Sequence, residues 1–318
     1  VPSESLISNF VKNLVPASKK IKVVKKASGF FNKLQRELDS LFRKKNNSLM
    51  NNYSKKKPEE ETMADAVNKE AQNYYEIYKI ISQENYELGK SISIFINEFK
   101  IQNENVEQSS FLLPEQMKLI IMLIKSSSDS LNNYFNFGKS NTQNMLKYSR
   151  PAGEKFIFNK IYFKLFELYN HKYESENKKL KEKIKSITEK LNIEEIMTFL
   201  EIKEKHRCLE NYIKNNYSPN YLPFKSTIDC INKIEYEQSP KDKINTLLNS
   251  GLDMRNTLLG CDKGELNSMD DELPLYVYIS TQLNLKNPVA EFHLLDDYLR
   301  LSEWDDKENK ICFIYSGI

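Results

Sequence analysis

Three consecutive acidic residues ahead of a proline are the residues best placed to do chemistry in this chain. They stand in the segment Met269-Asp270-Asp271-Glu272-Leu273-Pro274-Leu275-Tyr276-Val277-Tyr278-Ile279. Proline is tolerated in the first turn of a helix, and carboxylates there interact favourably with the positive end of the helix dipole. The segment therefore predicts the start of an apolar helix. From the residues alone, acidic capping of a core helix is the favoured interpretation.

Conventional catalytic and metal-binding patterns are absent from the sequence. The three histidines have no H-E-x-x-H spacing, and neither G-x-x-x-x-G-K-[ST] nor G-x-S-x-G occurs. The four cysteines are widely spaced and include no C-x-x-C pair, which argues against a zinc site and a disulfide framework. We therefore expect no cofactor, no metal and no covalent chemistry of the protein's own, in a reducing, cytosolic compartment.

The acidic segment resembles the signature of the vacuolar-protein-sorting-nine domain, which is Ala-Asp-[Asp/Glu]-aromatic-Leu-Pro with a tyrosine four residues after the proline. The residues that fit this signature are Asp270, Asp271, Leu273, Pro274 and Tyr278. Met269 stands in place of the alanine, and Glu272 stands in place of the apolar residue.

Other segments resemble the same family in order and spacing. The run SPKDKI at 239–244 is similar to the family's S-P-x-x-K-hydrophobic helix start. Asn287-Pro288 with the helix-like run at 291–299 is similar to its N-P turn and the helix after it. The residues at 154–166 are similar to its opening E-K-hydrophobic…K-L-Y…L-F helix. The resemblance covers roughly residues 150–318.

The C-terminal motif of the family departs most from its pattern here. The family shows G-E-x-G-Y-Y-[Leu/Phe]-T, whose tyrosine packs against the switch region of a GTPase. The equivalent stretch, residues 309–316, has no glycine, and Phe313 or Tyr315 is its candidate aromatic residue.

The resemblance implies a guanine-nucleotide exchange factor for a Rab-five-type endosomal GTPase, cytoplasmic and peripheral on endosomal membranes, acting in vesicle-mediated transport and endocytosis. Asp270 would be its acidic finger. The expected GTPase-binding residues are Met269, Asp271, Leu273, Pro274, Phe313 and Tyr315. Two alternatives remain: a non-catalytic helical scaffold or adaptor that retains the fold, and a protein that binds membrane or nucleic acid through its basic N-terminal arm.

The elements that must position these residues are helices, because strand-like alternation is nearly absent and the chain has only 8 Gly and 10 Pro. We predict an all-α fold with a basic arm and linker at 1–62, a helical bundle at 63–150 and a layered helical domain at 151–318. Apolar residues at heptad spacing predict one long helix over 63–100, either as a wall of the bundle or in a dimeric coiled coil.

The remaining helices follow from breaks and apolar runs. Pro151 predicts a break, and the dense apolar run from Phe156 to Tyr169 predicts a buried helix. After a second break at 219–223, helices are expected at 224–234, 240–259 and 273–283. In the second of these, Ser239 is the candidate N-cap and Pro240 the first helical residue.

The net charge of +3 conceals a strong asymmetry. Residues 1–57 carry 14 Lys and Arg against 3 Asp and Glu, a net of +11, and the rest of the chain carries −8. The basic arm indicates an anionic partner, for which we expect membrane rather than nucleic acid; a solvated tail is the alternative. Neither end of the sequence is typical of a chain terminus, so a fragment of a longer protein is expected.

Overall fold

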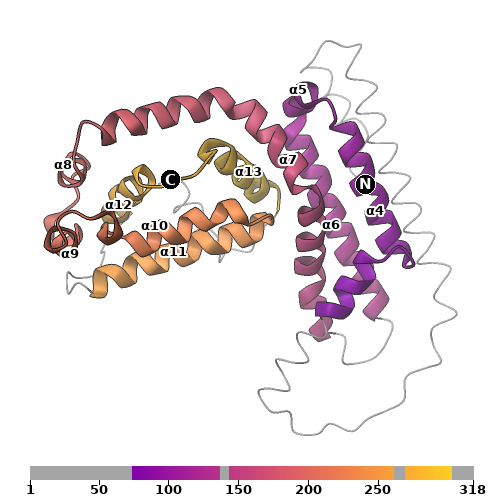
Figure 1. Ribbon diagram of the computed structural model, residues 1–318. Coiled ribbons are helices and arrows are strands. Elements are labelled where there is room, and N and C mark those ends of the chain that lie inside the picture. The colour runs from indigo at the N-terminus through magenta and orange to yellow at the C-terminus, as the bar shows by residue number, and fades with distance from the viewer. Residues whose placement is uncertain (1–73, 137–142, 261–268, 303–318) are drawn as a thin grey trace, which may run out of the picture. The chain divides into compact units, whose positions relative to one another are not determined.

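The computed structural model of the chain describes residues 74–136, 143–260 and 269–302 (Figure 1). These residues form helices and contain no strand, so the predicted all-α fold is confirmed for them. The longer helices, in chain order, are α4 (Glu87–Gln102), α6 (Leu113–Asn136), α7 (Gln143–Thr188), α10 (Lys225–Asn232), α11 (Pro240–Gly260), α12 (Met269–Thr281) and α13 (Pro288–Leu301). Within the same ranges, no helix combines the length and the apolar character needed to cross a membrane.

Short helices connect these longer ones. Those between α4 and α6 are α5 (Val106–Ser109) and η1 (Ser110–Leu112). Those between α7 and α11, other than α10, are α8 (Ile193–Phe199), η2 (Glu204–His206), α9 (Glu210–Lys214), η3 (Pro219–Tyr221) and η4 (Lys233–Tyr236).

The chain divides into two compact units, one of residues 1–94 with 126–152 and one of residues 95–125 with 153–318. In the first unit, the described apolar side chains that lie buried are Ile77, Ile81, Leu88, Ile92, Leu131 and Ala152. The division lies close to the domain boundary predicted at residue 151, but it assigns 95–125 to the second unit. The predicted domain boundaries therefore stay predictions.

Of the long helix predicted over 63–100, residues 63–73 lie outside the described part of the chain, and residues 74–100 form two helical segments where one was predicted. Residues 74–82 are helical, residues 83–86 form a turn, and α4 begins at Glu87. Gly89 explains the turn, because a Cβ at this position would lie 2.2 Å from the carbonyl oxygen of Gln83. Any other residue would clash there, so the turn depends on the missing side chain. Asn85, the one polar residue in the heptad series, is exposed in this turn.

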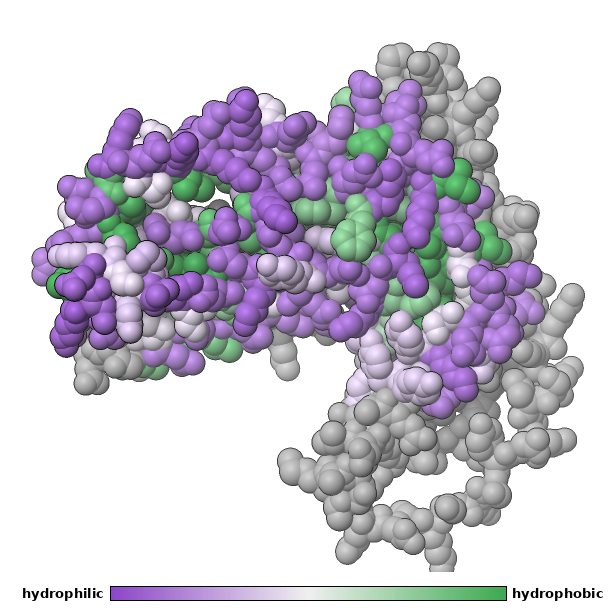
Figure 2. Space-filling model, viewed as in Figure 1, coloured by the Kyte–Doolittle hydropathy of each residue, from purple (hydrophilic) through white to green (hydrophobic). Residues whose placement is uncertain are grey.

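The break predicted at Pro151 is also wrong. Pro151 lies inside α7, which runs on to Thr188. A proline removes one backbone donor from a helix, and the neighbouring turns, with Ala152 and Ile157 fully buried, remain helical around it. The irregular point of α7 is Tyr173, whose φ of −107° and ψ of 16° are not helical. After Tyr173, α7 carries mainly hydrophilic side chains, which are coloured purple in Figure 2.

The N-terminal half of α7 within the second unit is the predicted buried helix. Its fully buried apolar residues are Ile157, Phe158, Ile161, Leu165, Leu168 and Tyr169. The ring of Phe158 packs edge-on against Tyr298 of α13, with 5.8 Å between ring centroids. Helix α11 contacts both α10 and α13, and α10 also contacts α12. These helices form the framework that holds the start of α12.

Candidate functional site

The acidic segment opens α12. This helix begins at Met269, so Asp270 is its second residue and Asp271 its third. The helix starts four residues earlier than the expected Leu273, and Pro274 stands in its second turn rather than its first. Because proline has no N–H, the carbonyl of Asp270 lacks the donor that a helix normally supplies four residues later. The side chains of Met269 and Asp270 lie outside the described part of the chain.

One side of α12 is buried and another is open. The apolar residues predicted on the buried side of this helix are Leu275, Tyr278, Ile279 and Leu283. The first three are fully buried, whereas Leu283 is only half-buried. The ring of Tyr278 packs edge-on against Phe224, with 6.4 Å between centroids. Burial raises the pKa of Tyr278 above its ordinary value. Leu273, in contrast, is 40% exposed.

Asp271 is held by a lysine from a distant segment. Its Oδ1 lies 2.5 Å from Nζ of Lys203, and the Asp271 side chain is only 9% exposed, whereas that of Lys203 is 58% exposed. The hydrogen bond from Lys203 keeps the pKa of Asp271 below its ordinary value. Figure 1 shows α8 and α9, which flank Lys203 in the sequence, at the same end of this unit as α12. Sequence periodicity gave no sign of this pairing.

The lysine belongs to a loop of residues 201–208, which we call the 201–208 loop. Its two end residues, Glu201 and Cys208, have φ angles of 57° and 49°. Non-glycine residues in this left-handed region carry strain of order 1–3 kcal/mol each, and they persist where the surrounding structure fixes them. Ile202 and His206 of the loop are buried, and the Arg207 Nε–H donates to the Ile202 carbonyl at 2.9 Å.

Glu272 is paired on another element. Arg255 of α11 donates to it through Nε (3.0 Å to Oε1) and through NH2 (2.7 Å to Oε1 and 3.0 Å to Oε2). Glu272 is the position at which the family pattern has an apolar residue, and here its buried carboxylate is neutralised by this two-pronged contact. The first turns of α12 are therefore tied to the 201–208 loop through Asp271 and to α11 through Glu272.

Residues from three of the resembling segments meet in the core of the second unit. Lys243 of the SPKDKI run is fully buried, and its Nζ lies 2.9 Å from Oε2 of Glu291, on α13. The same ammonium donates to the Ile234 carbonyl and lies 4.9 Å from the ring centroid of Tyr162, on α7. The Tyr162 hydroxyl donates to Oε1 of Glu291 at 3.3 Å. Burial lowers the pKa of Lys243 and raises that of Glu291.

Two more polar contacts join α7 to α13. The Tyr298 hydroxyl donates to Oε1 of Glu154 at 2.5 Å. The Tyr169 hydroxyl donates to Oδ2 of Asp297 at 2.8 Å. Glu154 is the glutamate of the E-K-hydrophobic segment, so that segment has a structural role. Together with Tyr162 and Glu291, these pairs fix α7 against α13.

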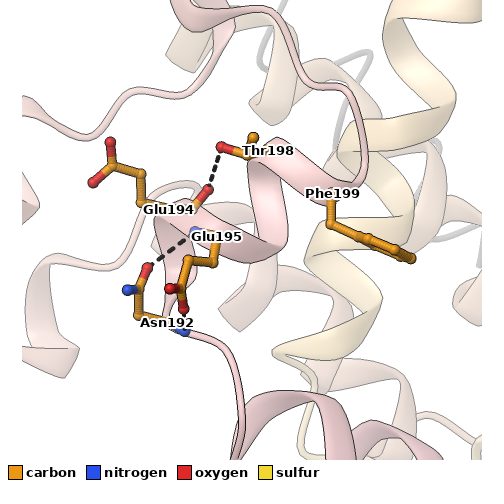
Figure 3. Close-up of a pocket in the computed structure, with 5 residues that line it drawn as sticks. All are labelled: Asn192, Glu194, Glu195, Thr198 and Phe199. Atoms are coloured by element: carbon orange, nitrogen blue, oxygen red, sulfur yellow. Dashed lines mark hydrogen bonds between the residues drawn. The ribbon is translucent and has the colours of Figure 1, made fainter.

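An open hollow of about 600 Å³ lies beside α8 and is lined by Asn192, Glu194, Glu195, Thr198 and Phe199 (Figure 3). The Asn192 side chain accepts from the backbone N–H of Glu195, and the Glu195 carboxylate accepts from the backbone N–H of Asn192. These polar groups therefore cap their own helix. Phe199 is 75% exposed and points away from the cap. Nothing in this hollow converges on a ligand.

Residues 224–315 match the family model of the Vacuolar sorting protein 9 (VPS9) domain. This part of the chain is similar to a VPS9 domain. It contains α10 to α13 and the Asp270 segment. No curated protein matches the chain closely enough to be named as a relative. Helix α7 precedes the matched VPS9 residues, but Tyr162 and Glu154 bind α13 within them. Phe313 and Tyr315 belong to the match and lie outside the described residues.

Proposed function

We propose that the chain is a guanine-nucleotide exchange factor that promotes GDP release from a Rab-five-type small GTPase in endosomal or vacuolar trafficking. The observation that carries the proposal is the VPS9 match over residues 224–315, which includes the whole acidic segment. VPS9 domains act on this class of GTPase. The position of Asp270 in the first turn of α12 supports its assignment as the acidic finger.

The chemistry of the finger follows from charge. Bound GDP is held by Mg²⁺ and by the P-loop lysine of the GTPase. A carboxylate inserted at that point competes with the β-phosphate for both cations and repels the phosphate. One unit charge at about 4 Å corresponds to roughly 4 kcal/mol at an effective dielectric constant near 20. Full expression of that energy would accelerate release by about three orders of magnitude.

The framework around Asp270 suits a rigid finger. The side chains of Tyr276 and Tyr278, farther along α12, are fully buried, and Glu272 is fixed to Arg255. A preorganised charge does not have to be reoriented when the GTPase binds, so more of its electrostatic effect reaches the reaction. Exposed Leu273 and the neighbouring Met269 and Pro274 would contact the GTPase. Asp271, Phe313 and Tyr315 complete the proposed binding residues.

A nucleotide-release assay tests the proposal. The full chain is added to a panel of Rab GTPases loaded with a fluorescent GDP analogue, in the presence of excess GTP. We expect accelerated release from Rab-five-type members and little effect on the others. Binding to a nucleotide-free GTPase without accelerated release would support the non-catalytic scaffold, for which the glycine-free sequence at 309–316 is the motivating observation.

The basic arm supplies the proposed peripheral attachment to endosomal membrane. Residues 1–57 lie outside the described part of the chain, so the argument rests on their net charge of +11. Deleting them should weaken binding to vesicles containing phosphatidylserine, and the difference should shrink as salt increases. Unchanged binding after the deletion would contradict a membrane role, and stronger retention of RNA than of vesicles would indicate a nucleic-acid partner.

A further inference from the structure

The 201–208 loop presents one side chain to the start of α12 from a backbone that is fixed on both sides. Ile202 precedes Lys203, and His206 follows it; both are buried. The His206 backbone N–H donates to the Lys203 carbonyl at 2.8 Å. The left-handed residues Glu201 and Cys208 close the loop at its ends. The Lys203 backbone is therefore held in place, while its side chain reaches out to Asp271.

The contact with Asp271 lies one residue from the proposed finger. The Lys203 ammonium is 2.5 Å from Oδ1 of Asp271, whose side chain is nearly buried. Successive residues of a helix point about 100° apart. Asp271 and Glu272 are accordingly tied to different elements, Lys203 on one side and Arg255 on the other. The two residues that follow Asp270 in α12 are therefore held by ion pairs to two other elements.

We propose that Lys203 is a positioning residue for the exchange reaction: its ion pair with Asp271 fixes the first turn of α12, and thereby aims Asp270 at the nucleotide site of the GTPase. This inference rests on the proposed exchange function. It assigns a role to a segment before residue 224, outside the VPS9 match. A misplacement of about 1 Å at a reacting group reduces rates by up to roughly a hundredfold, so losing the anchor has a measurable effect.

The test compares Lys203→Met with Lys203→Arg in the release assay, using the full chain. Lys203→Met should reduce the maximal release rate roughly tenfold, equivalent to about 1.4 kcal/mol, while the half-saturating concentration of the chain stays unchanged. Lys203→Arg should retain most of the rate because it keeps the charge. An unchanged maximal rate with a raised half-saturating concentration would mean that Lys203 contacts the GTPase directly, and would overturn the positioning role.

Lys205→Met is the matched control. Lys205 is exposed on the same loop, and this substitution removes the same charge as Lys203→Met. We expect it to release nucleotide at the wild-type rate. Equal losses in the Lys203 and Lys205 variants would indicate general attraction by positive charge, which overturns the proposal. Melting temperatures of all three variants should stay within about 2 °C of wild type, since an ion pair with one exposed partner contributes little to stability.

Hydrogen exchange separates this inference from the proposed function. In Lys203→Met, the backbone N–H groups of Leu273 and Leu275, which bond back into the first turn in a helix, should exchange faster than in wild type, and those in α11 should not change. If the wild-type chain does not accelerate nucleotide release, the proposed exchange function is wrong, whatever the hydrogen-exchange rates are. If the wild-type chain is active and Lys203→Met releases nucleotide equally fast, or shows the same hydrogen exchange at Leu273 and Leu275, only the positioning role is wrong.

Discussion

Lys243 and Glu291 form an ion pair inside the second unit, with Nζ 2.9 Å from Oε2 and with side chains that are 0% and 4% exposed. The lysine comes from α11 and the glutamate from α13, and the ring of Tyr162 from α7 lies over the ammonium. Two charges removed from water are tolerated only when each is paired and hydrogen-bonded. The pair thus makes three helices interdependent, and it explains why Lys243, the second lysine of the SPKDKI run, is fully buried.

Lys243→Met should lower the free energy of unfolding by about 3–5 kcal/mol, because it leaves the Glu291 carboxylate buried without its cation. Urea unfolding followed by far-ultraviolet circular dichroism measures the loss. Lys243→Met combined with Glu291→Leu should recover most of it, since both charges are then gone. The exposed pair of Lys225 and Asp229 is the control, and Lys225→Met should change stability by about 1 kcal/mol or less.

Asp270→Ala should reduce accelerated nucleotide release about a hundredfold or more, given the charge effect proposed for the finger. The loss of a carboxylate near a helix N-terminus should lower stability by only about 0.5–2 kcal/mol. Release kinetics and melting curves on the same preparation separate the two effects.

Asp271→Asn is the comparison variant, because it removes the same charge from the adjacent residue. Its effect should be smaller and should resemble that of Lys203→Met, since both break one ion pair. Equal losses in the Asp270 and Asp271 variants would show that bulk negative charge matters rather than one placed carboxylate. Wild-type release by Asp270→Ala would end the finger mechanism.

Replacing Arg255 should destabilise the protein more than replacing its partner Glu272. Arg255→Met leaves a buried carboxylate without its donors and should destabilise the protein by about 1–3 kcal/mol. Glu272→Leu restores the apolar residue of the family pattern and leaves a half-exposed arginine that water can solvate, so its effect should be under about 1 kcal/mol. Thermal melting checks the order. A larger loss for Glu272→Leu would mean that the carboxylate has a further role.

Acid should destabilise the chain through His206. Burial holds the pKa of this imidazole below its ordinary 6.5, and Lys205 and Lys203 act in the same direction while Asp271 opposes them. The unfolded chain then binds a proton near pH 6.5 and the folded chain binds it only at lower pH. The contribution of His206 to the free energy of unfolding is therefore fully present above pH 6.5. It is lost as the pH drops from there toward the pKa of the folded state. Burial lowers the pKa of His293 too, which adds a loss of the same sign.

The measurement is the melting temperature between pH 7.5 and 5.5. His206→Gln should make the melting temperature fall less between these two pH values. The difference from wild type should be about 2–4 °C for each kcal/mol of unfolding free energy that is no longer lost. The exposed His171 provides the control, and His171→Gln should leave the decrease as it is in wild type. A decrease of the same size in all three proteins would assign the acid sensitivity to other groups.

Local signals in the sequence predicted the helices and much of their burial. The apolar run at 156–169 and the start of α11 at Pro240 depend on spacing and on one proline, so a single sequence contains them. The breaks were less predictable. Pro151 stays helical because neighbouring turns are buried, and the turn at 83–86 depends on the contact of Gly89 with Gln83, which no periodicity reveals.

The site was predictable only in part, because its polar contacts join distant residues. The sequence predicted that Asp270 opens a helix and that Leu275 and Tyr278 are buried. It did not indicate that Lys203 holds Asp271 or that Arg255 neutralises Glu272, since these partners lie 68 and 17 residues away along the chain. The similarity of the SPKDKI run to its family counterpart likewise gave no hint that Lys243 reaches Glu291.

The separation between α7 and α13 also sets a time scale for making the protein. Tyr162 and Glu291 are 129 residues apart, and Tyr169 and Asp297 are 128 residues apart. A ribosome adding roughly 5–20 residues per second needs about 6 to 26 s to synthesise the chain between them. During that interval the face of α7 that carries Phe158, Tyr162 and Tyr169 has no α13 to cover it. Nascent chains that stall before α13 should therefore aggregate or be retained by chaperones, whereas chains that pass residue 301 can close the domain.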